Sequence, residues 1–201
     1  MLIGYMWLNK ANYTMIQNIT GFSPNTVSNY IKLIRELIIE TLDRNEKIRG
    51  QNVIVEIDES LFENGKEGIW VMGGVERTPE KKCFFKVVKN RNARTIRSVI
   101  KKYVKPRSKI YTDMWRGYKN LEELNMRHIS INHGRNFVDP GTGAHTNTIE
   151  GLWGVVKSKI RSRYRTKKLI NNHFQEFIWR RKHKSDLWKG LLDSLREISY
   201  E

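Results

Sequence analysis

The chain has 201 residues, 39% of them hydrophobic, which suits one domain, or one domain with a small addition, that buries a core. Lys and Arg number 37 against 21 Asp and Glu, and the resulting charge of +16 favours a nucleic-acid partner over a merely soluble basic protein. The single cysteine, Cys83, excludes an internal disulfide and a thiolate zinc site, and no apolar run has the length of a membrane span. We therefore expect an intracellular, DNA-associated protein with no membrane partner.

Residues 1–45 have the pattern of a small helical, helix-turn-helix-like DNA-binding segment. The apolar residues 1–8 are interpreted as a helix whose start is missing; they lack the basic region and cleavage site of a signal peptide. A short helix over 13–19 and a longer one over 24–42 follow, joined by a tight turn, with Ser23 as the cap of the second. An ordinary helical hairpin explains the same pattern equally well, and the net charge favours DNA contact. The side chains offered to DNA are Asn25, Thr26, Asn29 and Lys32.

Beyond a polar linker at 43–52, strands and helices alternate. The β-branched and apolar runs predict strands over 53–58, 69–75, 83–88, 109–112 and 128–131, and helices over 94–104 and 115–124, with a further helix beginning near 146. Short gaps make the first three strands an antiparallel meander. Three hairpin strands, then helix, strand, helix, strand and helix is the order of an RNase H-like α/β fold, a five-stranded mixed sheet with flanking helices. We expect this domain to cover residues 50–185.

Three acids have positions that suit one shared site. Asp58 and Asp113 come at the ends of the first and fourth predicted strands, which are neighbours in such a sheet, and Glu150 lies in the helix that follows. Carboxylates of this kind bind Mg²⁺ or Mn²⁺, and two such ions activate the attacking oxygen and stabilise the leaving one in phosphoryl transfer. Each acid alone is weak evidence, since Asp58 competes with Glu56 and Glu59 and Asp113 is also a candidate helix cap. The three together predict a two-metal site.

The helix that carries Glu150 has recognisable start signals. Thr146 or Asn147 is placed to cap it, and Glu150 then occupies the capping-box position. Asn147 is the rival third metal ligand, but a carboxylate brings charge and longer reach, so we assign Glu150 as the ligand and Asn147 as a neighbouring polar contact. The predicted polar face consists of Asn147, Glu150, Gly154 and Lys157. The predicted core face consists of Ile149, Leu152, Trp153 and Val156.

A basic run follows from Lys157 to Lys168, with seven basic residues and no acid. Basic and other residues alternate in it, which favours a helix end that continues as an extended arm against a phosphate backbone over a merely solvated charge run. The arm residues are Lys159, Arg161, Arg163 and Arg165. Two closing helices are predicted over 169–183 and 187–200, the second forming a separate C-terminal element at 186–201, and their aromatic residues are expected in the core.

Several motifs carry a family signal. They are residues 56–60, 110–113 with Gly117 and Tyr118, 137–140, 145–153 with Lys157, and 175–180. Together they resemble the DDE transposases, in particular the Merlin group and the related ISXO-type transposases of bacterial insertion sequences, over about residues 50–183. The chain departs from many relatives in one respect, because a single cysteine cannot build their N-terminal zinc-binding segment.

The resemblance implies DNA transposition, with strand hydrolysis at terminal inverted repeats followed by strand transfer to target DNA. It implies that Asp58, Asp113 and Glu150 are the catalytic acids, holding two Mg²⁺ or Mn²⁺ ions, and that Lys157 contacts a phosphate. His145 and Asn147 are expected as auxiliary residues of the same site. We expect double-stranded DNA as the partner of a homodimer or larger assembly. The alternatives are a non-catalytic or domesticated DNA-binding protein and an RNase H-like nuclease.

Overall fold

The computed structural model describes residues 1–42, 46–48, 53–131 and 143–197. Most of the predicted linker and all of the motif at 137–140 lie outside these residues. The chain forms two compact units, Met1–Asp43 with Gln175–Glu201, and Arg44–Phe174. The last segment of the chain thus groups with the first, and the division into 1–45, 50–185 and 186–201 stays a prediction.

The helical unit consists of α1 (Leu2–Leu8), α2 (Tyr13–Thr20), α3 (Pro24–Glu40), the second half of α6 (Ile170–Lys182) and α7 (Leu187–Glu197). Gly21, with a φ of 70°, ends α2, and the Ser23 hydroxyl accepts a hydrogen bond from the Thr26 backbone N–H at 3.2 Å, as the predicted cap requires. Trp179 is fully buried and its indole donates to the Ser194 hydroxyl, which confirms that this aromatic belongs to the core.

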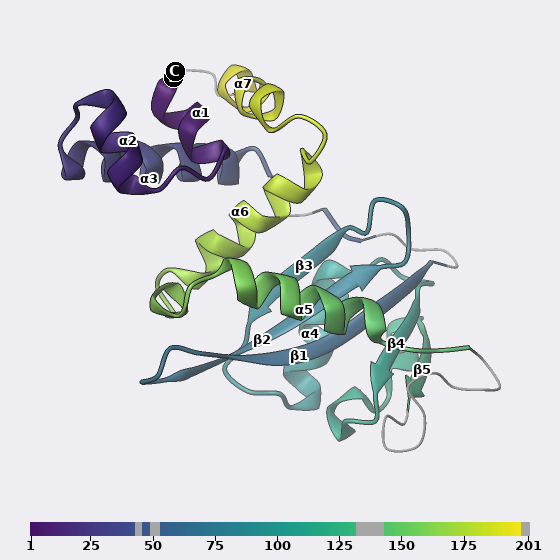
Figure 1. The fold of residues 1–201 in the computed structure, drawn as a ribbon. Helices are drawn as coiled ribbons and strands as arrows, with labels where there is room; N and C mark the ends of the chain where they lie inside the picture. Colours follow the sequence, from purple (N-terminus) through teal and green to yellow (C-terminus); the bar gives the residue numbers. More distant parts are fainter. Residues whose placement is uncertain (43–45, 49–52, 132–142, 198–201) are drawn as a thin grey trace. The chain divides into compact units, whose positions relative to one another are not determined.

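The second unit is built on a five-stranded sheet. Its strands are β1 (Ile54–Glu63), β2 (Gly68–Glu76), β3 (Cys83–Val87), β4 (Lys109–Asp113) and β5 (Arg127–Ile131), in the order β3-β2-β1-β4-β5. The first three strands pair antiparallel, whereas β4 pairs parallel with β1 and β5 parallel with β4. Helix α4 (Ala93–Tyr103) covers one face and α5 (Asn147–Lys159) the other (Figure 1). This is the predicted RNase H-like fold.

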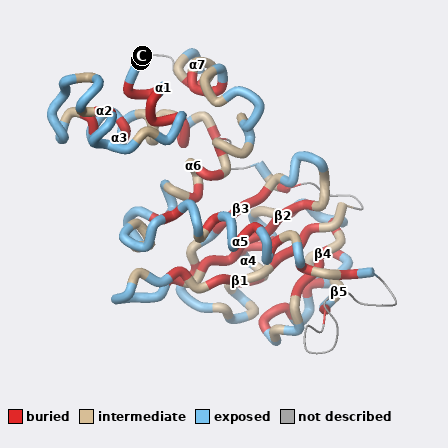
Figure 2. The backbone as a smooth tube through the Cα atoms, in the orientation of Figure 1, coloured by how far each residue is buried: buried red, intermediate tan, exposed pale blue. Residues whose placement is uncertain are grey.

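Most strand residues are buried or half-buried, as the red and tan stretches of the strands in Figure 2 show. On the α4 face, Ile57 and Met72 pack against Ile96 and its neighbours in the helix. On the α5 face the core is aromatic, with edge-to-face contacts from Phe62 to both Trp153 and Phe174. Alternate residues of β1 therefore face different helices, which decides what each of its acids does.

Two predicted elements differ from the observed ones. Strand β1 does not end at Asp58 but continues to Glu63, because β2 is long enough to pair with it over its whole length. The predicted helix over 115–124 is two short 3₁₀ turns, Arg116–Tyr118 and Leu121–Leu124. Asn120 lies between them with a φ of 63°, a left-handed conformation that a continuous helix does not allow.

Candidate active site

Asp58 and Asp113 lie on neighbouring parallel strands, at equivalent positions along them. The register pairs Glu56 of β1 with Tyr111 of β4, and each aspartate follows two residues later on its own strand. Residues two apart on a strand share a face, so both aspartates are on the face that α5 covers. The sequence-based pairing of these two strands is confirmed, although Asp58 is a mid-strand residue and Asp113 a strand-end one.

Trp153 of α5 fixes the Asp58 carboxylate. Its indole Nε1–H donates to Asp58 Oδ2 at 3.0 Å. The ring lies against Gly73, the partner of Asp58 across the β1–β2 ladder, where an added Cβ would come within 2.5 Å of the indole. The absence of a side chain at Gly73 thus lets the indole reach the aspartate.

The three acids affect one another electrostatically. Burial raises the pKa of Asp58 to about 6, and the negative charges of Asp113 and Glu150 add to this rise. The Glu59 backbone N–H and the Trp153 indole act in the opposite direction. Ionised Asp58 is therefore held where its charge lacks full compensation, which is the condition that a bound cation relieves.

Asp113 and Glu150 each accept a hydrogen bond from close by in the chain. Asp113 Oδ1 accepts from the Trp115 backbone N–H at 2.9 Å, and Glu150 Oε1 accepts from the Thr146 hydroxyl at 2.8 Å. Among the described residues, no three Asp, Glu, His or Cys side chains stand close enough together to hold an ion. The fold places the two aspartates at equivalent positions on neighbouring strands, and Glu150 is near enough for its charge to act on Asp58. The three carboxylates are not close enough to one another to bind the same ion in this structure.

Helix α5 begins as predicted but is capped differently. Thr146 is the N-cap and makes no side-chain cap, and Glu150 is one residue beyond the capping-box position. The cap comes instead from the buried Glu56, whose Oε2 accepts from the Thr148 and Ile149 backbone N–H groups at 2.9 Å each. The exposed face of α5, with Asn147, Glu150 and Gly154, and its buried face follow the predicted pattern.

Glu56 is also the centre of a network that the sequence did not reveal. Arg77, just beyond β2, donates from Nε to Glu56 Oε1 at 2.5 Å and from Nη2 to the His145 carbonyl and ring Nδ1. Its guanidinium lies 5.0 Å from the Tyr111 ring centroid. His145 therefore contributes to holding the start of α5.

Glu59 is on the opposite face of β1 from Asp58, towards α4. Burial raises the pKa of Glu59 to about 7; the nearby Tyr118 and Arg91 oppose this rise and the two aspartates add to it. Glu59 Oε1 and the Tyr118 hydroxyl face each other without a hydrogen bond of good geometry in the described structure. Of the three acids in 56–59, only Asp58 is thus available to the α5 face as a ligand.

The segment after α5 is folded, not extended. It makes a 3₁₀ turn at Ser162–Tyr164, and the predicted extended arm is wrong because Arg165 turns back to the chain. Arg165 donates to the carbonyls of Ile160 and Lys157 at 3.0 and 2.7 Å, which caps the end of α5. Lys159, Arg161 and Arg163 are exposed. Lys157 lies over the Phe62 ring at 5.4 Å.

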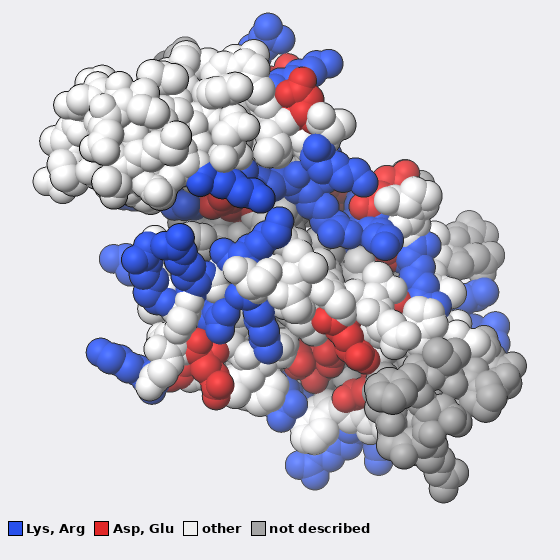
Figure 3. All heavy atoms as spheres, viewed as in Figure 1, with Lys and Arg blue, Asp and Glu red and all other residues white. Residues whose placement is uncertain are grey.

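The face of this unit that Figure 3 shows has an acidic area and a basic area. In Figure 3, acidic side chains gather over β1 and the first half of α5, and basic side chains gather over the segment between α5 and α6. A nucleic-acid strand bound to the basic area would lie next to the acidic area. The acidic area would repel the strand unless bound cations neutralised its charge.

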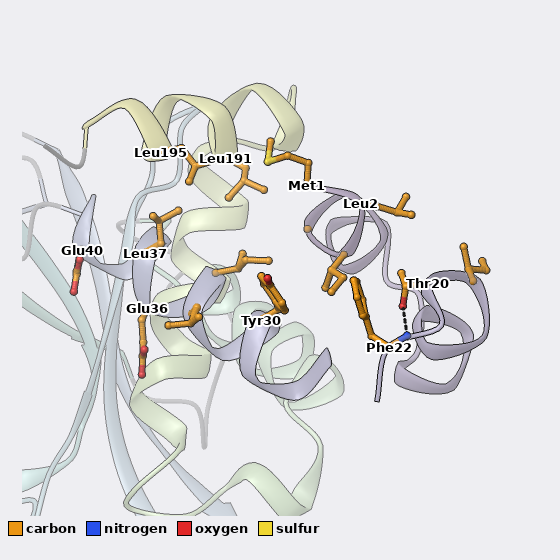
Figure 4. Close-up of a pocket in the computed structure, with 15 residues that line it drawn as sticks. Met1, Leu2, Thr20, Phe22, Tyr30, Glu36, Leu37, Glu40, Leu191 and Leu195 are labelled. Carbon is orange, nitrogen blue, oxygen red and sulfur yellow. Dashed lines mark hydrogen bonds between the residues drawn. The ribbon is translucent and has the colours of Figure 1, made fainter. Parts of the chain in front are cut away.

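In the helical unit, the candidate DNA-contacting residues are on the first half of α3. Asn25, Asn29 and Lys32 are exposed and Thr26 is half-buried. The second half borders an apolar hollow of about 920 Å³ between α1, α3 and α7, where Tyr30, Leu37 and Leu191 gather (Figure 4). Among the described residues that line it, Glu36 and Glu40 have charged side chains, and their negative charges disfavour a phosphate backbone there.

Known proteins share parts of this sequence. The sequence profile of the ISXO2-like transposase domain matches residues 45–182. An uncharacterised transposase-like protein of Haemophilus influenzae is 32% identical over 79 residues, which are 39% of this chain and 63% of that protein. The chain thus spans less than two thirds of this curated relative.

Two solved structures are similar at 14% identity. One is a chain of the simian T-cell lymphotropic virus intasome in complex with the PP2A regulatory subunit B56 gamma, with a TM-score of 0.47 over 89% of this chain and 67% of that one. The other is the HTLV-2 integrase catalytic core domain in complex with magnesium, with a TM-score of 0.46 over 65% and 86%.

No helix in the described part of the chain combines the length and apolar composition needed to cross a membrane. The matched profile covers most of the chain, including β1, β4 and α5 with their three acids. The chain therefore belongs to the ISXO2-like transposase domain family.

Proposed function

We propose that the chain is a DDE-type transposase that hydrolyses DNA strands at terminal inverted repeats and transfers the freed ends to target DNA. Asp58, Asp113 and Glu150 are its catalytic acids. The observation that carries this proposal is that two aspartates occupy equivalent positions on adjacent parallel strands, beneath the helix that bears the glutamate. Family membership supports the same reaction class.

The residues fit a divalent cation in their chemistry. All three donors are carboxylates, as Mg²⁺ and Mn²⁺ prefer. Burial and, to a smaller extent, the charges of Asp113 and Glu150 raise the pKa of Asp58, and a bound cation would offset both effects. Bound there, two ions would supply an activated attacking oxygen and a stabilised leaving oxygen. Asp58 is oriented by Trp153, and Asp113 by the Trp115 backbone N–H.

Double-stranded DNA is the partner that the charges support. The exposed Lys159, Arg161 and Arg163 offer sequence-independent phosphate contacts, whereas the first half of α3 offers polar side chains of the kind that read base edges. Each chain carries one set of catalytic acids. We therefore propose a homodimer or larger assembly on DNA, so that both ends of an element meet an active site.

Metal-dependent nicking of a supercoiled plasmid tests the proposal. The wild-type chain is expected to nick DNA with Mg²⁺ or Mn²⁺ and not with EDTA. Asp58→Asn and Asp113→Asn should lose this activity and still bind DNA, because each removes one anionic ligand with little change of shape. Glu63→Gln, an exposed acid at the end of β1, is the matched control and should nick normally. Nicking at wild-type rates by either Asn variant would overturn the assignment of the acids.

Two other functions are separated by further results of the same assay. A general nuclease of this fold would nick DNA but would not join an oligonucleotide with a free 3′-OH to the plasmid, whereas a transposase is expected to do so. A non-catalytic DNA-binding protein would bind the plasmid and leave it intact with either metal.

A further inference from the structure

A second charged site lies next to the candidate active site, around Arg91. Its guanidinium carbon is 3.7 Å from the ring centroid of Trp70 and 4.7 Å from that of Trp115. Contact with two indole faces favours the cation and restricts its rotamers, so the arginine is fixed before any ligand arrives.

The described residues offer this guanidinium no anionic partner at contact distance. Within the part of the chain that the structure describes, Arg91 makes neither an ion pair nor a side-chain hydrogen bond, although Glu59 is near enough to be influenced by its charge. Other arginines of the chain pair with glutamates: Arg35, Arg77, Arg97 and Arg180. The five N–H donors of the Arg91 side chain are thus held in place, and no described residue accepts a hydrogen bond from them.

Arg91 also lines a hollow of about 430 Å³, together with Trp115, Arg116 and the start of α4. Gly117 forms part of the wall, and a Cβ there would come within 2.8 Å of the Trp115 indole nitrogen and 2.9 Å of the Arg91 carbonyl oxygen. The glycine therefore permits the close packing that shapes the hollow. Arg116, exposed, adds a second positive charge.

Trp115 connects this hollow to the acids. Its indole nitrogen donates to the Arg91 carbonyl at 3.2 Å, and its backbone N–H donates to Asp113 Oδ1 at 2.9 Å. An anion bound at Arg91 would therefore lie beside the end of β4, where Asp113 is. Among the anions that suit a planar guanidinium, a phosphodiester matches the proposed substrate.

We propose that Arg91, clamped between Trp70 and Trp115 and assisted by Arg116, binds a backbone phosphate of the DNA strand that enters the acid site. The ligand class rests on the proposed function, which supplies DNA as the substrate. Arg91 is a positioning residue in this view, since it holds the strand and does not touch the reacting atoms.

The test is DNA affinity measured against salt concentration by fluorescence anisotropy, with a short duplex and no divalent metal. Arg91→Gln is expected to weaken binding roughly tenfold and to lower the slope of log affinity against log salt by about 0.9, the value for one lost phosphate contact. Arg94→Gln is the matched control; this exposed arginine is on α4 but does not line the hollow, and its slope should equal that of the wild type. If Arg91→Gln unfolds, Arg116→Gln takes its place with the same expectation.

Methylphosphonate substitution identifies the ligand itself. Neutralising the duplex phosphates one at a time should reveal one position that weakens the wild type and has no effect on Arg91→Gln, because the two changes remove the same contact. Inorganic phosphate that protects against thermal unfolding equally in both proteins, together with an unchanged salt slope, would overturn the proposal. That result would leave the proposed function intact, because nicking by the acids is measured separately and depends on metal.

Discussion

Among the three proposed catalytic acids, Asp58 is the one whose surroundings disfavour the ionised form. Burial raises its pKa to about 6, and the charges of Asp113 and Glu150 add to the rise, although the hydrogen bond from the Trp153 indole opposes it. Asp113 is at a strand end with a backbone donor, and Glu150 is on an exposed helical face. The energetic demand for a cation is thus greatest at Asp58.

Asp58→Asn should stabilise the metal-free protein in a pH-dependent way. The folded-state pKa is raised above the ordinary value, so the folded protein holds the proton more tightly and wild-type stability falls as pH rises from about 4 through 6. Asparagine does not titrate and still accepts from Trp153. In urea unfolding, the variant's advantage should be near zero at pH 4, grow to at most about 3 kcal/mol, and level off above pH 7. An advantage that is the same at every pH would show that Asp58 is not perturbed.

Glu150 and Asn147 are one helical turn apart, and both are exposed. If Glu150 is the third ligand, Glu150→Gln should reduce the nicking rate by about 10²-fold or more at saturating Mg²⁺, and Asn147→Ala distinctly less. Both variants need their folding confirmed by circular dichroism. The opposite ranking would move the ligand to Asn147.

The sequence predicted that Asp58 and Asp113 lie on neighbouring strands, but it did not predict what surrounds them. The order of strands was enough to bring Asp58 and Asp113 together. Glu56 was only a competitor for the same role, because a strand-borne glutamate looks the same in sequence whether it caps a helix, pairs with an arginine or binds a metal. The period-two rule places Glu56 with Asp58 and Glu59 on the other face, but nothing local shows that Arg77 and the start of α5 meet it.

At the scale of elements, helix α5 depends on a contact from outside itself. Its first turn has no side-chain cap of its own, and Glu56 of β1 accepts from two of its N–H groups. Because the negative charge is at the positive end of the helix, the contact also suits the helix dipole. It ties the helix that carries Glu150 to the strand that carries Asp58.

Glu56→Gln should therefore loosen the start of α5. Removing one charge of the Glu56–Arg77 pair leaves a largely buried guanidinium uncompensated, and we expect a loss of about 2–4 kcal/mol in the free energy of unfolding. Hydrogen exchange at the Thr148 and Ile149 amides should quicken more than exchange in β2. Glu63→Gln serves as the surface control, and unchanged protection at the two amides would show that Glu56 does not hold the helix.

Three of the predicted helices agree closely with the structure, whereas the basic segment after α5 does not. Helices α2, α3 and α4 begin and end within about two residues of their predicted limits. The basic run after α5 was misread as extended, because alternation in sequence does not distinguish a strand-like arm from a tight turn. The outcome depends on Arg165, whose hydrogen bonds to the carbonyls at the end of α5 are tertiary in origin.

At the scale of the whole molecule, the chain is two units with different surfaces. The sheet unit carries the acids and the basic segment, and the helical unit carries α3 and an apolar hollow. The sequence did not show that α7 groups with the first three helices. An amphipathic face indicates that a helix is buried on one side, but it does not indicate which element covers that side. In the reaction that we propose, the excess positive charge would hold DNA beside acids that repel it.

The most direct measurement of the central claim is a change of metal preference. Asp58→Cys replaces a carboxylate ligand by a thiolate, which Mn²⁺ accepts more readily than the harder Mg²⁺. If Asp58 binds the catalytic metal, this variant should nick plasmid DNA with Mn²⁺ and be inactive with Mg²⁺, whereas Glu63→Cys should resemble the wild type with both ions. Wild-type nicking by Asp58→Cys in Mg²⁺ would contradict the claim.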